Sequence, residues 1–246
     1  RTYVVTGAAS GIGLATSELL VERGHRVIGV DLHDTDVNVD LSTPDGRKEL
    51  VARVTELSGG HIDAIIANAG LATPTATTVA VNFFGAVATL TGLRPLLADS
   101  AAPRAVVTVS MASLFPPDDG LLEALRAEDE TAALARGAEL EAAGGDAANL
   151  IYGTTKRALS LWVRRNAATA GSASCAHEHG LEGVVVLDHV TGAQHDRLER
   201  HVRHPHRHLG LTLDAGGQAA QQTTTADEVH AADQEVLRQL RRCLRE

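Results

Sequence analysis

Residues 6–13 of the chain read Thr6-Gly7-Ala8-Ala9-Ser10-Gly11-Ile12-Gly13. This glycine-rich stretch follows a short β-branched run at residues 3–5 and opens an amphipathic stretch at residues 12–23. A strand, a glycine turn and a helix in this order allow backbone N–H groups and the positive end of the helix to bind a pyrophosphate. A tight connection between a strand and a helix, without any ligand, is the other interpretation of the same residues.

Further strand-like and helix-like stretches alternate along the first two thirds of the chain. The expected strands are residues 3–5, 27–30, 64–67 and 105–109, and the expected helices are residues 12–23, 44–57, 82–97 and 151–168. This alternation predicts an α/β fold, a Rossmann-type doubly wound parallel sheet with helices on both faces. We expect residues 1–246 to form one such domain. Its ligands should bind at the carboxyl ends of the strands.

Composition limits the kind of protein. The chain has 246 residues, of which 44% are hydrophobic, and a net charge of -9. It can bury one large core, and its charge argues against nucleic acid or an anionic membrane as partner. No unbroken apolar run approaches the ~20 residues that span a bilayer, and no leader segment is visible. Two cysteines, Cys175 and Cys243, are too few for a disulfide framework. The expected location is the cytoplasm.

Residues 116–149 are acidic and alanine-rich, and they lie between Pro116-Pro117 and Gly144-Gly145. Leucines such as Leu121 and Leu125 recur at helical spacing, so we expect one or two helices inserted between a strand and the following helix. Such a short helical pair must cover its apolar stripe on this subunit or on a neighbour. We expect the insertion to govern subunit pairing. A mobile acidic flap over the site is the alternative.

Asp31 stands directly at the end of the second expected strand, 18 residues after Gly13. A carboxylate at this place can accept hydrogen bonds from both hydroxyls of a nucleotide ribose. The same carboxylate repels a 2′-phosphate, and the neighbours Leu32 and His33 offer no obligatory cation to offset it. A helix or turn cap is the alternative role of Asp31. Together with the glycine turn, it predicts NAD(H) rather than NADP(H).

The segment Tyr152-Gly153-Thr154-Thr155-Lys156 places a tyrosine and a lysine one helical turn apart on the same face. A free tyrosine hydroxyl has a pKa of about 10, and a nearby ammonium stabilises the phenolate. Such a pair is suited to deprotonating an alcohol at neutral pH. The chain holds only two tyrosines and two lysines, so chance is a poor explanation of the pair. A surface tyrosine packed on a lysine stem is the other interpretation.

Ser110 follows the fourth expected strand, at the edge of the sheet where ligands bind. Its hydroxyl can donate a hydrogen bond to a substrate carbonyl oxygen or to a developing alkoxide. A serine directly after a strand is otherwise a common turn residue.

These motifs, in this order over residues 3–165, resemble the short-chain dehydrogenase/reductase family. The resemblance implies a catalytic set of Asn82, Ser110, Tyr152 and Lys156, with Asn82 holding a proton-relay water. It implies that NAD(H) is bound by Gly7, Ser10, Gly11, Ile12, Gly13, Asp31, Asp40, Leu41, Asn68, Ala69, Gly70, Tyr152 and Lys156. Within these, Asp40-Leu41 corresponds to the family's pair under the adenine, and Asn68-Ala69-Gly70 to its N-A-G motif.

The spacing of the motifs narrows the resemblance. Ser110 and Tyr152 are 42 residues apart, whereas about a dozen residues separate them in typical family members. The insertion that fills this gap, together with the run at residues 40–48, resembles the bacterial 3α-hydroxysteroid dehydrogenase/carbonyl reductase subgroup. In most family members the flanking helices build a dimer interface. The expected assembly is a homodimer or a homotetramer.

Residues 171–246 depart from the family pattern, because no Pro-Gly follows Lys156 and bulky apolar residues are scarce. Residues 184–187 and 209–213 still resemble strands, and residues 229–244 have a weak helical period. Two explanations are open, a diverged segment or an out-of-frame reading of a GC-rich gene. The alternating His201, His204, His206 and His208 suggest either a metal site or a solvated loop. The lack of a matching Cys or carboxylate favours the loop, so no metal is expected.

Under the resemblance, the reaction is the reversible oxidation of a secondary alcohol to a ketone, with NAD(H) as cofactor and a small molecule as the only substrate partner. A hydroxysteroid or a bulky apolar ketone is the expected substrate, with Leu114 and Phe115 as an apolar wall. The alternative is a non-catalytic NAD(H)-binding sensor or scaffold with the same fold. The aberrant tail favours this alternative, and the intact Tyr152, Lys156 and Ser110 argue against it.

Overall fold

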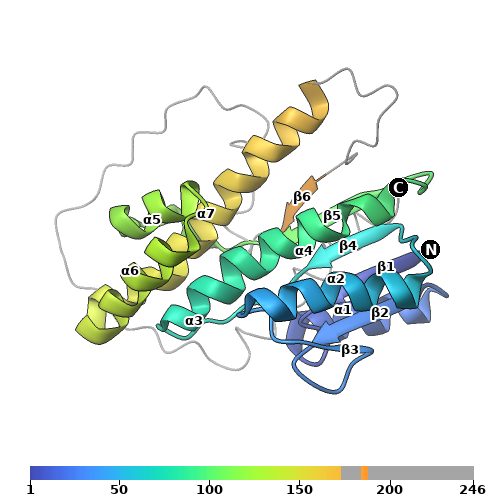
Figure 1. Ribbon diagram of the computed structural model, residues 1–246, viewed down its shortest axis with the longest axis horizontal. Coiled ribbons are helices and arrows are strands. Elements are labelled where there is room, and N and C mark those ends of the chain that lie inside the picture. Colours follow the sequence, from blue (N-terminus) through green and yellow to red (C-terminus); the bar gives the residue numbers. More distant parts are fainter. Residues whose placement is uncertain (173–183, 188–246) are drawn as a thin grey trace.

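The computed structural model describes residues 1–172 and 184–187 of the chain (Figure 1). Within these residues the strands form one six-stranded parallel sheet in the order β3-β2-β1-β4-β5-β6. Its strands are β1 (Thr2–Thr6), β2 (Arg26–Asp31), β3 (Val37–Asn38), β4 (Ala64–Ala67), β5 (Arg104–Thr108) and β6 (Val184–Leu187). The predicted doubly wound parallel sheet is confirmed.

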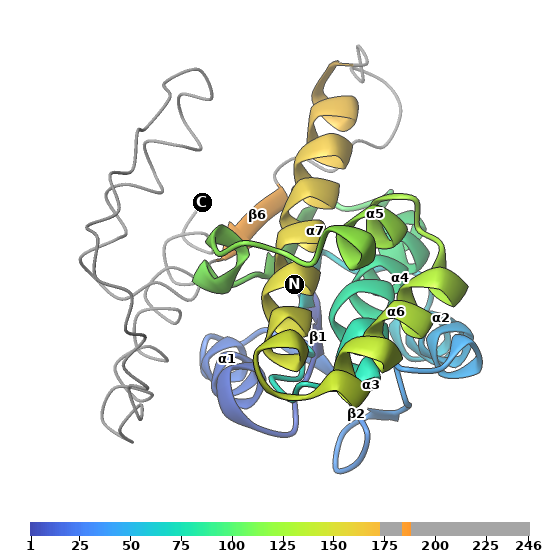
Figure 2. The same ribbon diagram turned by 90° about the vertical axis from the view of Figure 1, so that its left-hand side faces the viewer.

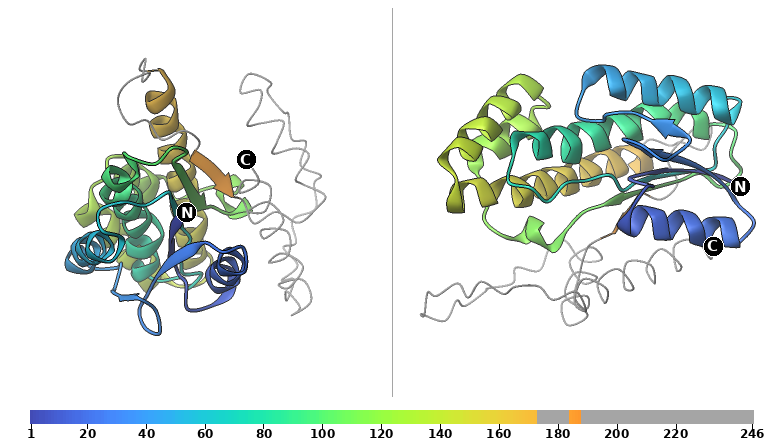
Figure 3. Two further views of the ribbon diagram at one scale, coloured as in Figure 1. Left: turned by 90° about the vertical axis from the view of Figure 1, so that its right-hand side faces the viewer. Right: turned by 90° about the horizontal axis from the view of Figure 1, so that it is seen from below.

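Helices lie on both faces of the sheet. They are α1 (Gly11–Glu22), α2 (Pro44–Ser58), α3 (Ala76–Val79), α4 (Ala86–Leu93), α5 (Asp119–Arg126), α6 (Glu130–Ala143) and α7 (Gly145–Ser172). A π-helical turn, η1 (Ala80–Gly85), joins α3 to α4, and 3-10 turns form η2 (Arg94–Leu97) and η3 (Met111–Leu114). Figure 3 shows α2, α4 and α7 on one face of the sheet and α1 on the other.

The middle residues of the central strands are apolar because both faces of the sheet are covered. Val4 and Val5 of β1 are fully buried, and Val4 lies in register with Ile28 of β2 and Ile65 of β4. This explains why the strands appear in the sequence as short unbroken runs of valine and isoleucine rather than as an alternating pattern.

Most predicted elements are present, and the differences have local causes. The predicted helix at residues 82–97 begins at Ala76, so Asn82 lies inside it rather than at its start. Residues 73–79 are rich in β-branched residues, mostly threonine, which have low helix propensity. The sequence pattern therefore does not indicate a helix at this first turn. The two-residue strand β3 was not predicted. The helix predicted at 151–168 begins at Gly145, and its bounds were otherwise nearly correct.

The predictions for residues 171–246 can be compared with the structure only where it describes these residues. The strand predicted at residues 184–187 is present as β6. The features predicted at residues 209–213 and 229–244, and the histidines His201, His204, His206 and His208, lie outside the described residues.

The segment Ala76–Leu97 is long and apolar enough to cross a membrane by length and composition. Polar residues such as Thr77 and Asn82 interrupt the segment, so it contains no unbroken apolar run of that length in the sequence. About two thirds of its most apolar window is buried inside the fold, as expected of a core helix.

The inserted helices α5 and α6 pack on their own subunit (Figure 2). Leu121, Leu125 and Leu140 are buried in the main hydrophobic core together with Ala133. α6 runs along α3 and α7. Gly137 of α6 lies so close to α3 that a Cβ at this position would be 2.9 Å from Val79 Cγ2. The expected inserted helices are therefore present, and their apolar stripe is covered by this subunit.

At the amino end of the sheet, Asp63 ties three segments together. Its carboxylate accepts hydrogen bonds from Thr2 N at 2.8 Å and from Ser100 Oγ at 2.8 Å. Burial raises the pKa of Asp63, but these hydrogen bonds and the charges of His61 and Arg1 outweigh burial, and the pKa lies below its ordinary value of 3.8. A carboxyl whose pKa is lower in the folded protein stabilises the fold at neutral pH and loses this effect in acid.

We expect Asp63→Asn to lower the free energy of unfolding by about 2 kcal/mol at pH 7, because a charged acceptor of two hydrogen bonds is lost. The difference from the parent should be fully present above about pH 4 and should shrink as the pH falls below it, because the parent carboxyl then takes up a proton. Urea unfolding at pH 7 and pH 3 measures this. An equal difference at both pH values would contradict the assignment.

Candidate active site

The glycine turn after β1 leaves no room for a side chain at Gly7 or Gly13. Gly7 has φ +73°, and a Cβ on Gly13 would lie 1.9 Å from the carbonyl oxygen of Gly7. Within the described residues, the side chain of Ser10 makes no capping hydrogen bond to α1, and the first turn of α1 carries no acidic residue. The backbone N–H groups of this turn, with Gly11 and Ile12 at the start of α1, therefore form a cradle suited to a pyrophosphate.

Asp31 lies at the carboxyl end of β2, beside this turn. Its Oδ2 accepts a hydrogen bond from Ala9 N at 2.9 Å, and its Oδ1 accepts one from Leu32 N at 2.7 Å. The carboxylate therefore keeps a fixed orientation next to the glycine turn. Each oxygen still has a lone pair for a ligand hydroxyl.

Asp40 and Leu41 follow β3 on the same side of the sheet. Leu41 is buried against Gly85 of η1, where an added Cβ would lie 3.1 Å from Leu41 Cβ. Asp40 is exposed, and its Oδ1 accepts from Ser42 N at 2.8 Å. Gly46 was not predicted as a site residue, yet a Cβ there would lie 2.0 Å from the carbonyl oxygen of Asp40. Glycine at this position lets α2 start directly against the Asp40 loop.

Polar contacts between strand ends hold Asn68, Ala69 and Gly70 in place. Thr6 Oγ1 accepts hydrogen bonds from the backbone N–H groups of Asn68 and Ala69, both at 3.0 Å. Thr108 Oγ1 donates to Asn68 Oδ1 at 3.0 Å. The carboxyl ends of β1, β4 and β5 are thus joined by side-chain hydroxyls, and the role of Thr108 was missed from the sequence.

Asn82 is buried within the π-helical turn η1. Its Oδ1 accepts from Leu71 N at 2.7 Å, and its Nδ2 donates to Leu71 O at 2.9 Å and to Thr155 Oγ1 at 3.4 Å. The side chain is therefore used to hold the loop after Gly70 and to contact α7. π-helical turns are frequent at functional sites because they change the direction in which helix groups point.

Lys156 on α7 is a buried cation at the centre of the site, with only 4% of its surface exposed. Its Nζ donates to the carbonyl oxygen of Thr108 at 2.9 Å and lies 5.8 Å from the centre of the Tyr152 ring. A Cβ on Gly70 would lie 3.4 Å from this Nζ and 3.2 Å from Asn82 Oδ1. The structure therefore brings Tyr152, Lys156, Asn82 and Gly70 together.

Ser110 reaches the same edge from β5. It is buried, and its Oγ accepts from Ala112 N at 3.2 Å as the cap of η3. α7 contacts η3 directly at Gly153, where a Cβ would lie 3.0 Å from the carbonyl oxygen of Ala112. The glycine next to Tyr152 thus allows the tyrosine helix to approach the serine turn, which the sequence alone did not reveal.

The segment after η3 carries two exposed apolar side chains. Leu114 is 57% exposed and Phe115 is 62% exposed. An exposed apolar pair beside a polar site is typical of a surface that receives an apolar ligand. Among the described residues, no group of His, Cys, Asp and Glu is arranged to hold a metal ion.

Comparison with known proteins agrees with this arrangement. The sequence profile of the short chain dehydrogenase family matches residues 1–120. A 3-alpha-hydroxysteroid dehydrogenase/carbonyl reductase from Comamonas testosteroni is 39% identical over 173 residues, which are 69% of this chain and 67% of that protein. A cis-4-hydroxycyclohexanecarboxylate dehydrogenase from Sinomonas cyclohexanicum is 40% identical over 92 residues, 31% of this chain and 36% of that protein.

Solved structures show the same relationship. The 3-alpha-hydroxysteroid dehydrogenase from Pseudomonas sp. B-0831, determined with NADH, superposes with a TM-score of 0.64 at 36% identity. The match covers 76% of this chain and 70% of that one. The aligned part therefore spans about two thirds of the length of the similar hydroxysteroid dehydrogenases.

We expect Asn82→Ala to lower the free energy of unfolding by about 2 kcal/mol, because the N–H and C=O groups of Leu71 lose their partner. Asn166→Ala is the matched control, since it removes an exposed asparagine whose side chain, within the described residues, bonds only to Trp162 O of α7. The control should change stability by less than about 0.5 kcal/mol. Urea denaturation measures both variants, and an Asn82→Ala protein as stable as the control would show that Asn82 does not hold the loop.

Proposed function

Because the chain belongs to the short-chain dehydrogenase/reductase family, we propose that it is an NAD-dependent oxidoreductase that interconverts a secondary alcohol and a ketone. The observation that carries this proposal is the placement of Lys156. Its ammonium is buried at the ends of β4 and β5, within reach of the Tyr152 ring and beside Gly70. A buried cation beside a tyrosine is an arrangement for proton transfer.

The glycine turn fits a dinucleotide, because Gly7 and Gly13 let it pack tightly against residues 68–69 while no side chain caps the first backbone N–H groups of α1 within the described residues. We assign the pyrophosphate to residues 7–13, the adenosine ribose to Asp31 and the adenine to Asp40 and Leu41. Asn68, Ala69 and Gly70 would lie along the rest of the dinucleotide. When bound, the nicotinamide supplies the acceptor or donor of hydride.

The residues of this chain would handle the proton. Tyr152 would take the hydroxyl proton of an alcohol, or return it to the alkoxide formed from a ketone. Lys156 would stabilise the phenolate and hold the nicotinamide ribose. Ser110 would donate a hydrogen bond to the substrate oxygen, where charge develops in the transition state. Asn82 would support the path by which the proton reaches water.

A hydroxysteroid or another bulky apolar carbonyl compound is the proposed substrate. The exposed Leu114 and Phe115 support this, because they offer apolar surface close to the turn that holds Ser110. The names of the similar hydroxysteroid dehydrogenases point to the same class. The proposed location is the cytoplasm, and the proposed assembly is a homodimer or a homotetramer. In such an assembly the inserted helices limit how α3 and α7 can pair with a neighbouring subunit.

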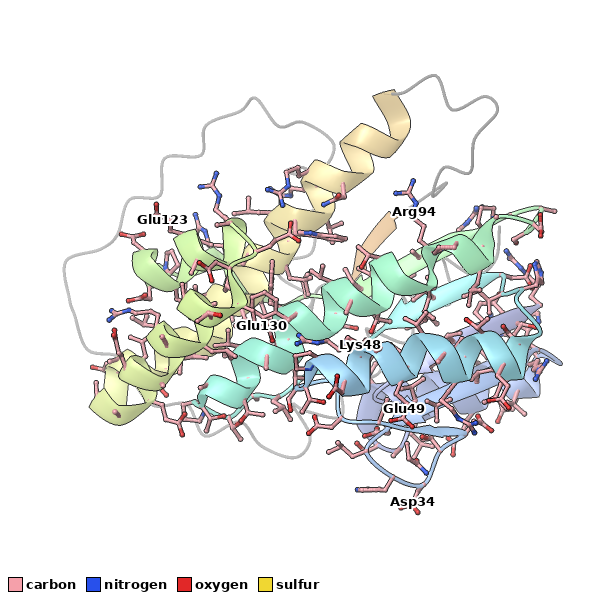
Figure 4. The ribbon with its side chains drawn as sticks, viewed as in Figure 1. Asp34, Lys48, Glu49, Arg94, Glu123 and Glu130 are labelled. Carbon is pink, nitrogen blue, oxygen red and sulfur yellow. The ribbon has the colours of Figure 1, made fainter. Side chains whose placement is uncertain are left out.

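Cofactor choice tests the proposed role of Asp31. The dissociation constant for NADPH should exceed that for NADH by about tenfold or more, about 1.4 kcal/mol, because the Asp31 carboxylate repels a 2′-phosphate. Asp31→Ala should narrow this ratio. Asp34→Ala is the matched control, since Asp34 is an acidic residue at the exposed tip of the same loop (Figure 4). Fluorescence titration measures the constants, and equal affinities in the parent would show that Asp31 does not face the ribose.

The rate of turnover tests the proposed role of Tyr152. Tyr152→Phe should lower kcat by about a thousandfold while NADH affinity changes little, because only the proton-carrying hydroxyl is removed. Tyr3→Phe alters the other tyrosine of the chain and should leave kcat unchanged. Initial rates with a panel of cyclic alcohols and ketones measure the effect. Near-normal turnover by Tyr152→Phe would refute the mechanism, and NADH binding without turnover by the parent would favour the sensor.

A further inference from the structure

Asp118 joins three helices at the point where the inserted helices meet α7. Its carboxylate caps α5 by accepting from Leu121 N at 2.7 Å. It also accepts from Arg136 of α6 in a two-pronged contact, 3.0 Å to Nε and 2.8 Å to Nη2. Its own backbone N–H donates to Thr154 Oγ1 of α7 at 2.9 Å.

The two groups that connect the insertion to α7 are shielded from water. The Asp118 side chain is 11% exposed, and Thr154 is fully buried. The hydrogen bonds of Arg136 hold the pKa of Asp118 below its ordinary value, so the carboxylate stays charged at neutral pH. Two-pronged contacts between arginine and a carboxylate fix direction as well as distance. The insertion therefore has a defined geometry where it contacts α7.

Thr154 belongs to the helical turn that carries Tyr152 and Lys156, and this turn is held from several directions. Gly153 lies against η3, and Thr154 is bonded to the Asp118 backbone. Thr155 is fully buried, donates from Oγ1 to the carbonyl oxygen of Tyr152 at 2.8 Å, and contacts Asn82. The insertion therefore supplies one of the contacts that fix the orientation of this turn.

The other end of the insertion is fixed to the core as well. At the start of α6, Glu130 accepts from Arg47 of α2 at 2.6 Å, and this buried guanidinium lies 5.9 Å from the ring centre of Phe84 in η1. Figure 4 shows that Glu123 of α5, by contrast, points away from the fold. Glu141 accepts from Ala76 N at 2.7 Å at the start of α3. Asp118 thus connects α7 to a helical pair that is itself held in place.

We propose that Asp118 is a positioning residue, which fixes the Tyr152 turn of α7 to the inserted helices through Thr154 and Arg136. The proposal rests on the proposed function, because Asp118 itself touches neither substrate nor cofactor in it. Loss of this contact should let the turn move by fractions of an ångström. Proton transfer depends steeply on the placement of the reacting groups, whereas binding of a large apolar substrate depends on it much less. The effect should therefore fall on kcat.

The experiment compares two pairs of variants in the full-length protein with NADH present. Asp118→Asn weakens the contact with Arg136, and Glu139→Gln is its control, because Glu139 is the exposed second partner of the same arginine. Thr154→Val removes the hydroxyl that accepts from Asp118 N, and Thr154→Ser restores it. We expect kcat to fall about tenfold in Asp118→Asn and Thr154→Val, with KM and the NADH dissociation constant within about twofold of the parent. Glu139→Gln and Thr154→Ser should resemble the parent.

Two results would overturn the proposal. Unchanged kcat together with a lower midpoint of thermal unfolding would show that Asp118 only stabilises the fold. A raised KM with unchanged kcat would show that the insertion acts on substrate access. If Asp118→Asn does not fold, the Thr154 pair makes the same comparison. Tyr152→Phe tests the proposed function separately. Near-normal turnover by Tyr152→Phe would refute the proposed function itself. A loss of turnover in Tyr152→Phe, but in neither Asp118→Asn nor Thr154→Val, would refute the role of Asp118 alone.

Discussion

The buried ammonium of Lys156 sets the strictest requirement in this fold. A cation removed from water is costly unless acceptors surround it. Here it donates to the carbonyl oxygen of Thr108, the last residue of β5. The requirement extends outward, since α7 must lie close to the sheet, and the ammonium packs directly against Gly70, where a Cβ would lie 3.4 Å from Nζ. The position of Tyr152, one helical turn before Lys156, follows from the same anchor.

Part of the site could be predicted because the residues concerned are close to one another both in sequence and in space. The glycine turn is an example, because the clash that excludes a side chain at Gly13 comes from Gly7, six residues earlier. Tyr152 and Lys156 share one helix face for the same reason. Helical spacing predicted the inserted helices as well. The strands were predictable because the sheet is covered on both faces, which produces unbroken runs of valine and isoleucine.

The residues that the sequence did not reveal act across long stretches of chain. Thr108 meets Asn68, and Asp118 meets Thr154, over separations of 40 and 36 residues. No local pattern marks a threonine whose hydroxyl will be buried, because threonine is common in loops and strands alike. Asn82 shows a related limit: the motif singles it out, but nothing in the motif indicates that its side chain is bonded to both backbone groups of Leu71.

An insertion between two residues that act together is tolerated only if the chain returns to the same place. In this protein the departing and returning segments are joined before the inserted helices diverge, at the contact between Gly153 and Ala112 and at the hydrogen bond between Asp118 and Thr154. The distance between the Ser110 turn and the Tyr152 turn is therefore determined by β5, η3 and α7 rather than by the length of the insertion. Beyond that junction, α5 and α6 bury their apolar stripe on α3 and α7, so the loop-closure entropy of the added residues is offset by core packing. The same packing covers surface of α3 and α7 that would otherwise face solvent, so the insertion that separates the Ser110 turn from the Tyr152 turn in sequence also extends the core.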